Sequence, residues 1–277
     1  MSSPPSPTLL VLVVDRLPPS SSNATLNALK VFLDAHLILR PSNRCALIGA
    51  RSGRAAFVGR AAPKAGGGAS PPGIANPSFS FAEGETLERL ERLGWRGAPE
   101  TRPTVAAGLS LAVCFGHRWQ NATPNGVVQV LVLTGDGGGR EGGAPFDPLA
   151  RQYRHIMNAV FTASKLGVTV DCLDFSRNEA PTMQQACFIT KGKYVHGRGG
   201  SGDDDVLPLL VYHFLPGKAA RQHLRTKGET SISFNASCFE TGESTNVGYL
   251  CSVCLSVTRK KHKACVVCRA PFKVGKR

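Results

Sequence analysis

Apolar residues along most of this chain alternate between short continuous runs and longer stretches with helical spacing. The run Leu9–Val14 is uninterrupted and ends in Asp15, which is typical of a strand buried on both faces of a parallel sheet. Four leucines then recur at helical spacing, namely Leu26, Leu29, Leu33 and Leu37. They predict a helix behind two cap candidates, Asn23 and Thr25.

The same alternation continues to about residue 215. Further strands are predicted over 45–48, 55–58, 127–133, 168–173 and 194–195, and helices over about 85–93, 104–118, 147–164, 181–190 and 205–215. The helix from Asp147-Pro148 has one side marked by Leu149, Tyr153, Ile156, Val160 and Ser164. This alternation predicts an α/β fold over residues 8–216, a mostly parallel, doubly wound sheet covered on both faces.

Two segments interrupt this pattern. Residues 59–80 are rich in proline and glycine, and they predict a surface loop or insertion. Residues 218–229 are polar and charged, so we expect a linker over 217–230. The remaining residues, 231–277, are then expected to form a small second module.

Four cysteines in this module form two C-x-x-C pairs, Cys251/Cys254 and Cys265/Cys268, with ten residues between the pairs. Two tight turns that each supply two thiolates suit a tetrahedral Zn²⁺, and four cysteines leave no open position for a catalytic water. Disulfides are the alternative. The N-terminal apolar run is too short for a signal peptide or a membrane span, so we expect a reducing compartment and one structural zinc ion.

Two nearby residues raise the question of a second metal ion. Cys238 and His262 bring the candidate ligands to six, whereas a two-zinc, RING-like module needs eight. The sequence therefore predicts a single zinc site, with His262 solvated within a basic run and Cys238 buried or free.

Net charge is concentrated in the same module. The chain carries a formal charge of +14, and residues 251–277 contribute eight Lys or Arg and no Asp or Glu. This basic tail suggests an anionic neighbour, either nucleic acid or an acidic protein surface. A solvated surface that keeps a small module soluble explains it equally well.

Elsewhere the sequence gives no catalytic set. Ligands of open α/β sheets bind at the carboxyl ends of strands, where Asp15 and Asp136 lie, and we expect both to cap backbone amides. Residues 137–142 match G-x-G-x-x-G, but the run leads into prolines instead of opening a helix, so nucleotide binding is not expected. We expect no enzymatic activity and no membrane association.

The order of elements resembles a von Willebrand factor A domain. The resemblance rests on a strand ending in aspartate, a later Leu-Thr-Gly-Asp-Gly turn and the segment Ile189–Tyr194. That family binds a metal through D-x-S-x-S after the first strand, together with a Thr and an Asp from two other loops. Here Leu17 and Pro19 replace both serines, so Mg²⁺ binding is not expected.

Together with the four cysteines, three segments narrow the resemblance. These are Gly248–Ser256, Met183–Thr190 and Tyr212–Pro216, and they resemble the small A-domain/zinc-finger subunit of the transcription and DNA-repair factor TFIIH. The resemblance implies a nuclear, non-catalytic core subunit that pairs with the complex's other A-domain subunit, which carries a RING-like finger. A ubiquitin ligase built on the zinc module and an independent DNA-binding protein are the alternatives.

Overall fold

The computed structural model describes residues 6–15, 22–51, 53–61, 104–135, 149, 152–176, 179–197, 206–221, 223–224, 232, 234–241 and 243–272. Several predictions lie outside these ranges: the helix over 85–93, most of the 59–80 loop, Asp136 and the run 137–142. Among the described helices, none is both long enough and apolar enough to cross a membrane.

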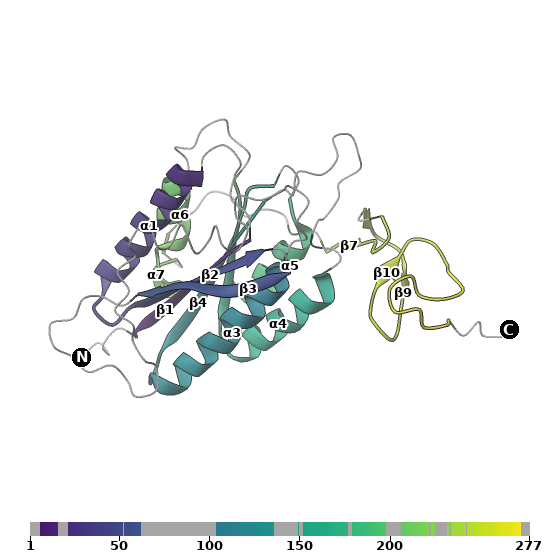
Figure 1. The fold of residues 1–277 in the computed structure, drawn as a ribbon, viewed down its shortest axis with the longest axis horizontal. Helices are drawn as coiled ribbons and strands as arrows, with labels where there is room; N and C mark the ends of the chain where they lie inside the picture. The colour runs from purple at the N-terminus through teal and green to yellow at the C-terminus, as the bar shows by residue number, and fades with distance from the viewer. Residues whose placement is uncertain are drawn as a thin grey trace.

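A six-stranded sheet forms the centre of the α/β domain, in the order β3-β2-β1-β4-β5-β6 (Figure 1). The strands are β1 (Thr8–Val14), β2 (Arg44–Arg51), β3 (Arg54–Ala61), β4 (Val127–Thr134), β5 (Thr169–Asp174) and β6 (Tyr194–His196). All neighbours pair in parallel except β2 and β3, which form an antiparallel hairpin. The predicted α/β fold with a mostly parallel sheet is therefore confirmed.

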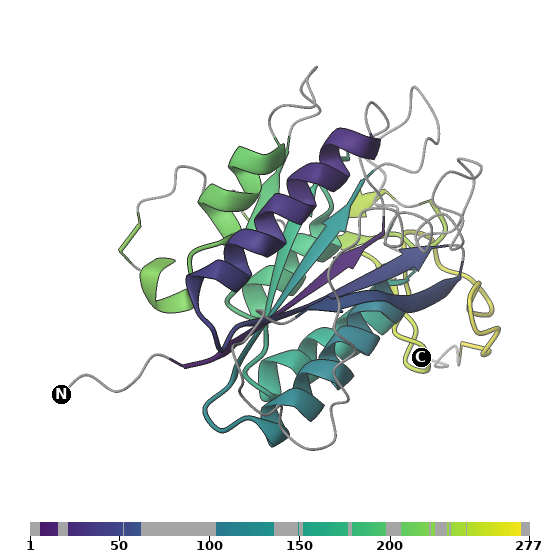
Figure 2. The same ribbon diagram turned by 60° about the vertical axis from the view of Figure 1, so that its left-hand side comes forward.

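Helices cover both faces of this sheet. One face carries α1 (Ser22–Leu39) and α6 (Val206–Phe214), and the other carries α3 (Val105–Ala122), α4 (Tyr153–Lys165) and α5 (Pro181–Ile189) (Figures 1 and 2). Side chains of a strand alternate between faces. Val11 and Val13 accordingly join the core under α3, α4 and α5, and Leu10 and Leu12 join the core under α1 and α6.

Helix α3 lies unusually close to the sheet because it carries two glycines on its buried side. A Cβ atom added to Gly108 would lie 2.6 Å from Val13 Cγ1 and 2.8 Å from the Ala50 Cβ atom. At Gly116 the same addition would meet Val128 Cγ1 at 2.7 Å. All three contacts are shorter than van der Waals separation, so the missing side chains let the helix backbone approach β1, β2 and β4.

Two predicted helix starts are wrong. Helix α1 already begins at Ser22, so the cap candidates Asn23 and Thr25 lie within its first turn. Helix α4 begins at Tyr153, with Gln152 as its N-cap residue, not at Asp147. On α4 the side chains of Tyr153 and Ser164 are exposed, because the buried side runs through Ile156, Met157, Ala159, Val160 and Ala163 instead.

A short helix, α7 (Lys218–Arg221), lies within the interval predicted as a linker. Its Arg221 guanidinium donates two hydrogen bonds of 2.8 Å to the fully buried carboxylate of Asp171 on β5. Gln129 Nε2 on β4 donates to the same carboxylate at 2.8 Å, and the Lys193 N–H donates at 2.7 Å. The chain is therefore fastened to β5, next to the edge strand β6, just before it leaves the α/β domain.

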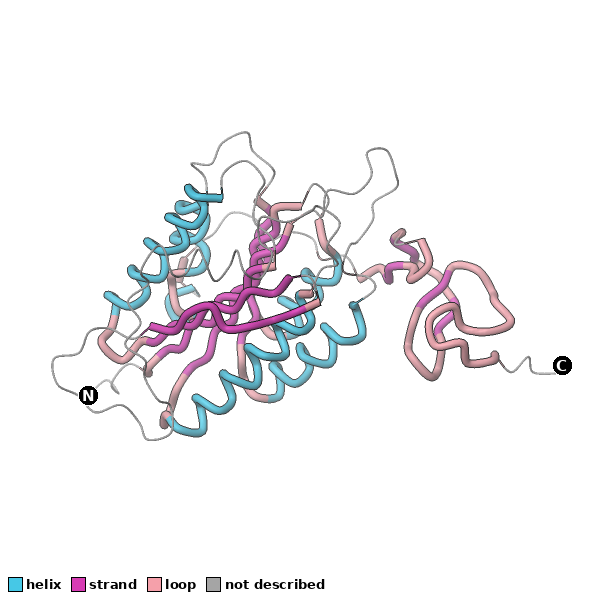
Figure 3. Tube along the Cα trace, in the orientation of Figure 1, coloured by secondary structure: helices cyan, strands magenta, loops and turns pink. Residues whose placement is uncertain are grey.

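The C-terminal part of the chain, which we call the cysteine module, comprises residues 234–241 and 243–272. It contains two small antiparallel pairs (Figure 3): β7 (Ala236–Ser237) with β8 (Ser244–Thr245), and β9 (Tyr249–Leu250) with β10 (Val257–Thr258). Its first residues contact α5. The Phe188 and Phe234 rings meet edge to face at 5.4 Å, and Gln185 Nε2 donates to the Asn235 carbonyl at 3.5 Å.

Candidate metal centre

Each C-x-x-C pair folds into the same tight turn. The Cys251 N–H donates to the Ser256 carbonyl at 2.9 Å, and the Leu255 N–H returns to the Cys251 carbonyl at 2.8 Å. Fourteen residues later, the N–H groups of Cys265 and Arg269 make the equivalent bonds to the carbonyls of Ala270 and Cys265, both at 2.9 Å. Two matching turns thus present two sulfur atoms each.

The residue after the second cysteine of each turn has a left-handed backbone conformation. Leu255 has φ 58° and Arg269 has φ 59°, a region that strongly favours glycine. This conformation turns the following residue back, so that the carbonyls of Ser256 and Ala270 can accept hydrogen bonds from the N–H groups of Cys251 and Cys265. The geometry of the turn therefore overrides the preference of the side chain, and such strain is common at binding sites.

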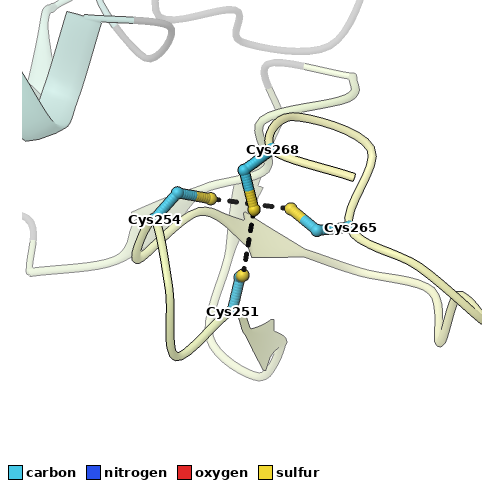
Figure 4. A group of neighbouring side chains, drawn as sticks. All are labelled: Cys251, Cys254, Cys265 and Cys268. Carbon is cyan, nitrogen blue, oxygen red and sulfur yellow. Dashed lines mark hydrogen bonds between the residues drawn. The ribbon is translucent and has the colours of Figure 1, made fainter. Parts of the chain in front are cut away.

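The four sulfur atoms converge on one point (Figure 4). All lie within 4.8 Å of one another, with Cys251 and Cys268 at 3.7 Å and Cys254 and Cys265 at 3.5 Å. Tetrahedral zinc with Zn–S bonds of about 2.3 Å places its sulfur ligands about 3.8 Å apart. Three of the four residues are buried. The predicted ligands are therefore brought together, and this group can hold a metal ion.

The thiol groups differ in how readily they lose a proton. Burial raises the pKa of Cys265, but hydrogen bonds from the Ser256 hydroxyl and from nearby N–H groups outweigh it and lower the pKa to about 6. The Ala270 N–H lowers the pKa of Cys268, but desolvation and the neighbouring thiols outweigh it and raise the pKa to about 12. Four adjacent thiols cannot all lose their protons without a metal ion, because the thiolates would repel one another. A divalent cation between them removes this repulsion.

Ser256 lies directly behind the sulfur atoms and is almost completely buried. Its Oγ is 3.1 Å from Cys254 Sγ and 3.2 Å from Cys265 Sγ. A hydroxyl in this place donates a hydrogen bond to a thiolate, and such outer contacts orient metal ligands. Ser256 could not be identified from the sequence, because a serine next to a C-x-x-C pair carries no signal of its own.

A third turn of the same kind surrounds Cys238. Its N–H donates to the Glu243 carbonyl five residues later, at 2.7 Å, the same spacing as in the two cysteine turns. Thr241 occupies the place of the second cysteine, and Gly242 follows it, where the other two turns have their left-handed residues. Cys238 is buried, as predicted. The third turn was missed because a single cysteine shows no pair spacing.

The Cys238 sulfur accepts hydrogen bonds from nearby groups, whereas the sulfur of a metal-binding cysteine would bind the metal ion. Burial raises the pKa of Cys238, but the Thr241 hydroxyl and the N–H groups of Thr241, Arg259 and Glu240 lower it by more. Among the described residues, the only group of three or more possible metal ligands is the set of four cysteines. In the described part of the chain, the third turn is thus held by hydrogen bonds to its sulfur.

One ion pair and one hydrogen bond join the third turn to the loop after β10. Arg259 Nη1 pairs with Glu243, and His262 Nε2 lies 3.1 Å from Glu240 Oε2. His262 keeps 25% of its side chain exposed, so it is partly solvated as expected, and its ring also contacts the Glu240 carboxylate, which was not expected. Sequence spacing could not reveal this, because the partners come together only through the turn.

At the carboxyl end of β1, Asp15 is buried and binds the backbone of a distant loop. Its Oδ1 accepts a hydrogen bond of 3.0 Å from the Thr104 N–H at the start of α3, and Thr104 Oγ1 accepts one of 2.9 Å from the Gly53 N–H. Asp15 therefore does bind a backbone amide, although not one in its own turn. These bonds directly link three loops at this edge of the sheet.

Asp174 forms a second polar cluster at the carboxyl end of β5. Its oxygens accept hydrogen bonds from the N–H groups of Ser176 and Ala180 and from the Tyr194 hydroxyl, at 2.9, 3.1 and 2.6 Å. Burial and the Asp174 carboxylate raise the pKa of Tyr194, so its hydroxyl stays protonated as a donor. This cluster orders the loop after β5 and uses the carboxylate to do so.

Comparison with known proteins agrees with this architecture. The family model "Transcription factor Tfb4" matches residues 7–269. General transcription and DNA repair factor IIH subunit tfb4 of Schizosaccharomyces pombe is 27% identical over 283 residues, covering 97% of this chain and 90% of the relative. General transcription factor IIH subunit 3 of Dictyostelium discoideum is 24% identical, covering 90% of this chain and 68% of the relative.

One solved structure shares the fold of the α/β domain. The crystal structure of the TFIIH p34 N-terminal domain superimposes with a TM-score of 0.53 at 20% identity, covering 76% of this chain and 98% of that chain. The family match extends beyond this domain and includes all four clustered cysteines. The chain therefore belongs to the Tfb4 family of transcription factors.

Proposed function

We propose that this protein is a non-catalytic structural subunit of the TFIIH core, acting in transcription initiation and nucleotide excision repair in the nucleus. The observation that carries the proposal is the family match over residues 7–269, which includes both the α/β domain and the cysteine module. We assign residues 8–216 to the A domain, 217–230 to a connector and 231–277 to a module in which Cys251, Cys254, Cys265 and Cys268 bind one structural zinc ion.

The surface of the A domain supports a role in assembly. On the face of the sheet that carries α4 and α5, Phe161 and Phe188 are each more than half exposed, at 53% and 54%. Exposed large apolar side chains are a feature of surfaces that a partner covers. The proposed partner is the other A-domain subunit of the complex, which the family resemblance implies and which carries a RING-like finger.

A ubiquitin ligase is not favoured. Ligase modules of the RING type hold two metal ions, and the third turn here offers Thr241 where a second metal ligand would be needed. Arg259 and His262, which face this turn, are engaged with Glu243 and Glu240. These contacts support a module with one metal ion.

Co-purification tests the assembly role. A tagged copy of the full chain, expressed at its natural level in its own cells, should recover the other core subunits of TFIIH in equal amounts. Recovery of the chain alone, or with ubiquitin-conjugating enzymes instead, would reject the proposal.

Zinc content tests the metal assignment. The purified chain should contain about one zinc ion per molecule, and Cys251→Ser should lose it, because one thiolate of a closed tetrahedral site is missing. Cys114→Ser is the matched control, since Cys114 is an exposed cysteine on α3. Two zinc ions per wild-type chain would contradict the single-site assignment.

The same variant separates the roles of the two domains. If the A domain carries the assembly surface, Cys251→Ser should still capture the partner subunit in a pull-down, at the level of Cys114→Ser. Loss of capture in Cys251→Ser alone would place the assembly surface on the zinc module.

A further inference from the structure

The loop after β10 carries a dense group of cations. Lys260, Lys261 and Lys263 are all exposed, and they follow Thr258, the last residue of β10. We call these three lysines the lysine loop. Arg269, in the second cysteine turn, is exposed as well. The feature was visible in the sequence as part of a basic tail, but its surroundings decide what it can bind.

Acidic residues close to the lysine loop are already engaged. The described residues of the cysteine module include two carboxylates, Glu240 and Glu243. Glu243 pairs with Arg259 and Glu240 with His262. Within the described residues, the lysine loop therefore has no carboxylate partner of its own. Three adjacent ammonium groups without counter-ions create a local positive potential that attracts a polyanion.

An exposed aromatic residue lies on the strand that pairs with β10, just before the lysine loop. Tyr249 on β9 pairs directly with Thr258 on β10, immediately before Arg259 and the lysine loop. Its side chain is half exposed, whereas Thr258 is buried. A tyrosine hydroxyl can donate a hydrogen bond to a phosphate oxygen of duplex DNA, so an exposed tyrosine is compatible with such a ligand.

The type of cation separates the two possible polyanions. Lysine is depleted in protein–protein interfaces. Arginine is preferred there, because its planar guanidinium can donate two parallel hydrogen bonds to one carboxylate. Phosphate backbones are bound well by lysine, which acts as a point charge and needs no fixed orientation. Arg259, just before the lysine loop, is bound to the carboxylate of Glu243. The three exposed lysines therefore remain available to an external anion. The composition therefore favours phosphodiester over an acidic protein.

We infer that the lysine loop binds the phosphate backbone of duplex DNA without sequence preference. This inference goes beyond the assembly role, because it assigns the cysteine module a ligand of its own. The Arg259–Glu243 and His262–Glu240 contacts are compatible with it, since they join the loop to the third turn while the three lysines stay in solvent.

Fluorescence anisotropy with the full, zinc-loaded chain tests this inference. The probe is a labelled DNA duplex of about 30 base pairs, titrated at salt concentrations from about 50 to about 200 mM. The variant is Lys260→Gln/Lys261→Gln/Lys263→Gln. Each lost phosphate contact should reduce the slope of log K against log salt by about 1, so the triple variant should lose about 2–3 units of slope.

A second triple variant controls for net charge. Arg54→Gln/Arg154→Gln/Lys165→Gln removes three exposed cations from the A domain and should leave the slope near that of the wild type. Equal losses in both variants would show a general charge effect and overturn the inference. So would unchanged binding by the lysine-loop variant, or binding of the single strand but not of the duplex.

Three further measurements test whether the loop binds an acidic protein instead of DNA and whether the variant is misfolded. Poly-glutamate at the same charge concentration should compete poorly for the wild-type chain; competition as strong as that of unlabelled duplex would overturn the inference.

The lysine-loop variant should retain one zinc ion and should still co-purify with the core subunits. Loss of co-purification in this variant would make the loop an assembly surface instead. Failure of the wild type to co-purify, with DNA binding intact, would reject only the assembly role.

Discussion

At the scale of single residues, the two left-handed positions of the metal centre show how a site imposes its geometry on the chain. Leu255 and Arg269 adopt a conformation that costs about 1 kcal/mol or more for a residue with a side chain. Their N–H groups close the two cysteine turns. The metal-binding geometry therefore depends on the residue after each C-x-x-C pair as well as on the cysteines.

Zinc affinity should depend on how easily the residue at position 255 adopts a left-handed backbone conformation. Leu255→Ile should weaken binding by about 1–2 kcal/mol, or roughly tenfold, because a β-branched residue resists positive φ. Leu255→Gly should bind at least as tightly as the wild type, since glycine adopts this conformation freely. Competition with a chromophoric chelator measures the affinities.

Val253→Ala is the control for this series, because Val253 is 69% exposed in the same turn and has no such backbone constraint. Equal affinity of the isoleucine and glycine variants would show that the left-handed backbone does not limit binding.

The four cysteines could be predicted from spacing alone, because a C-x-x-C pair is a local pattern with a specific chemistry. Other parts of the centre could not. Ser256 and Cys238 acquire their roles from contacts made by the turns, and His262 meets Glu240 only after two segments fold together. Local patterns predict ligands, whereas their supporting contacts depend on tertiary structure.

At the scale of elements, β1, β4, β5 and β6 were predicted to within one residue at each end, since a continuous apolar run is found where a strand is buried on both faces. Strands β2 and β3 were predicted over only 45–48 and 55–58, about half of their length. Helix ends were predicted less well. Helix α4 starts at Tyr153, because the buried stripe from Ile156 to Ala163 fixes the helix, and the Asp147-Pro148 signal lies before it. A cap signal marks a permitted start, and packing decides whether the helix begins there.

Helix α3 provides a test of packing against helix propensity. Gly108→Ala would gain up to about 1 kcal/mol from propensity, but its Cβ would clash with the Val13 side chain and the Ala50 Cβ. Since overpacking costs about 1–3 kcal/mol, we expect a net loss of stability of about 1 kcal/mol. Chemical denaturation of the full chain measures it.

Ala107 is exposed on the same helix, so Ala107→Gly calibrates propensity alone and should cost about 1 kcal/mol. A Gly108→Ala variant that is more stable than the wild type would mean that the sheet can give way under α3.

At the scale of the whole molecule, one ion pair joins the A domain to the segment that follows it. The Arg221 guanidinium is mostly buried against Asp171, whose side chain has no exposed surface. Sequence analysis placed Arg221 in a polar linker, since a single arginine gives no sign of a carboxylate partner fifty positions earlier. The division at residues 217–230 remains a prediction, and α7 shows that its first part is ordered.

Removing this arginine should destabilise the A domain. Arg221→Ala leaves the buried Asp171 carboxylate with only the Gln129 side chain and the Lys193 N–H, so we expect a loss of about 2–4 kcal/mol. Asp171→Asn/Arg221→Ala should be more stable than Arg221→Ala alone, because no charge is then left buried. Thermal and denaturant unfolding measure both, and additive losses would show that the two side chains do not interact.

The two anchor points also determine how this family can vary in length. Arg221 is fixed to the sheet, and Phe234 rests on α5, so the stretch between them is a closed loop with both ends held on the same domain. Doubling the length of such a loop costs only about 0.6 kcal/mol. Insertions between residues 222 and 233 should thus leave the cysteine module at its position beside α5, and relatives of different lengths are expected to differ there.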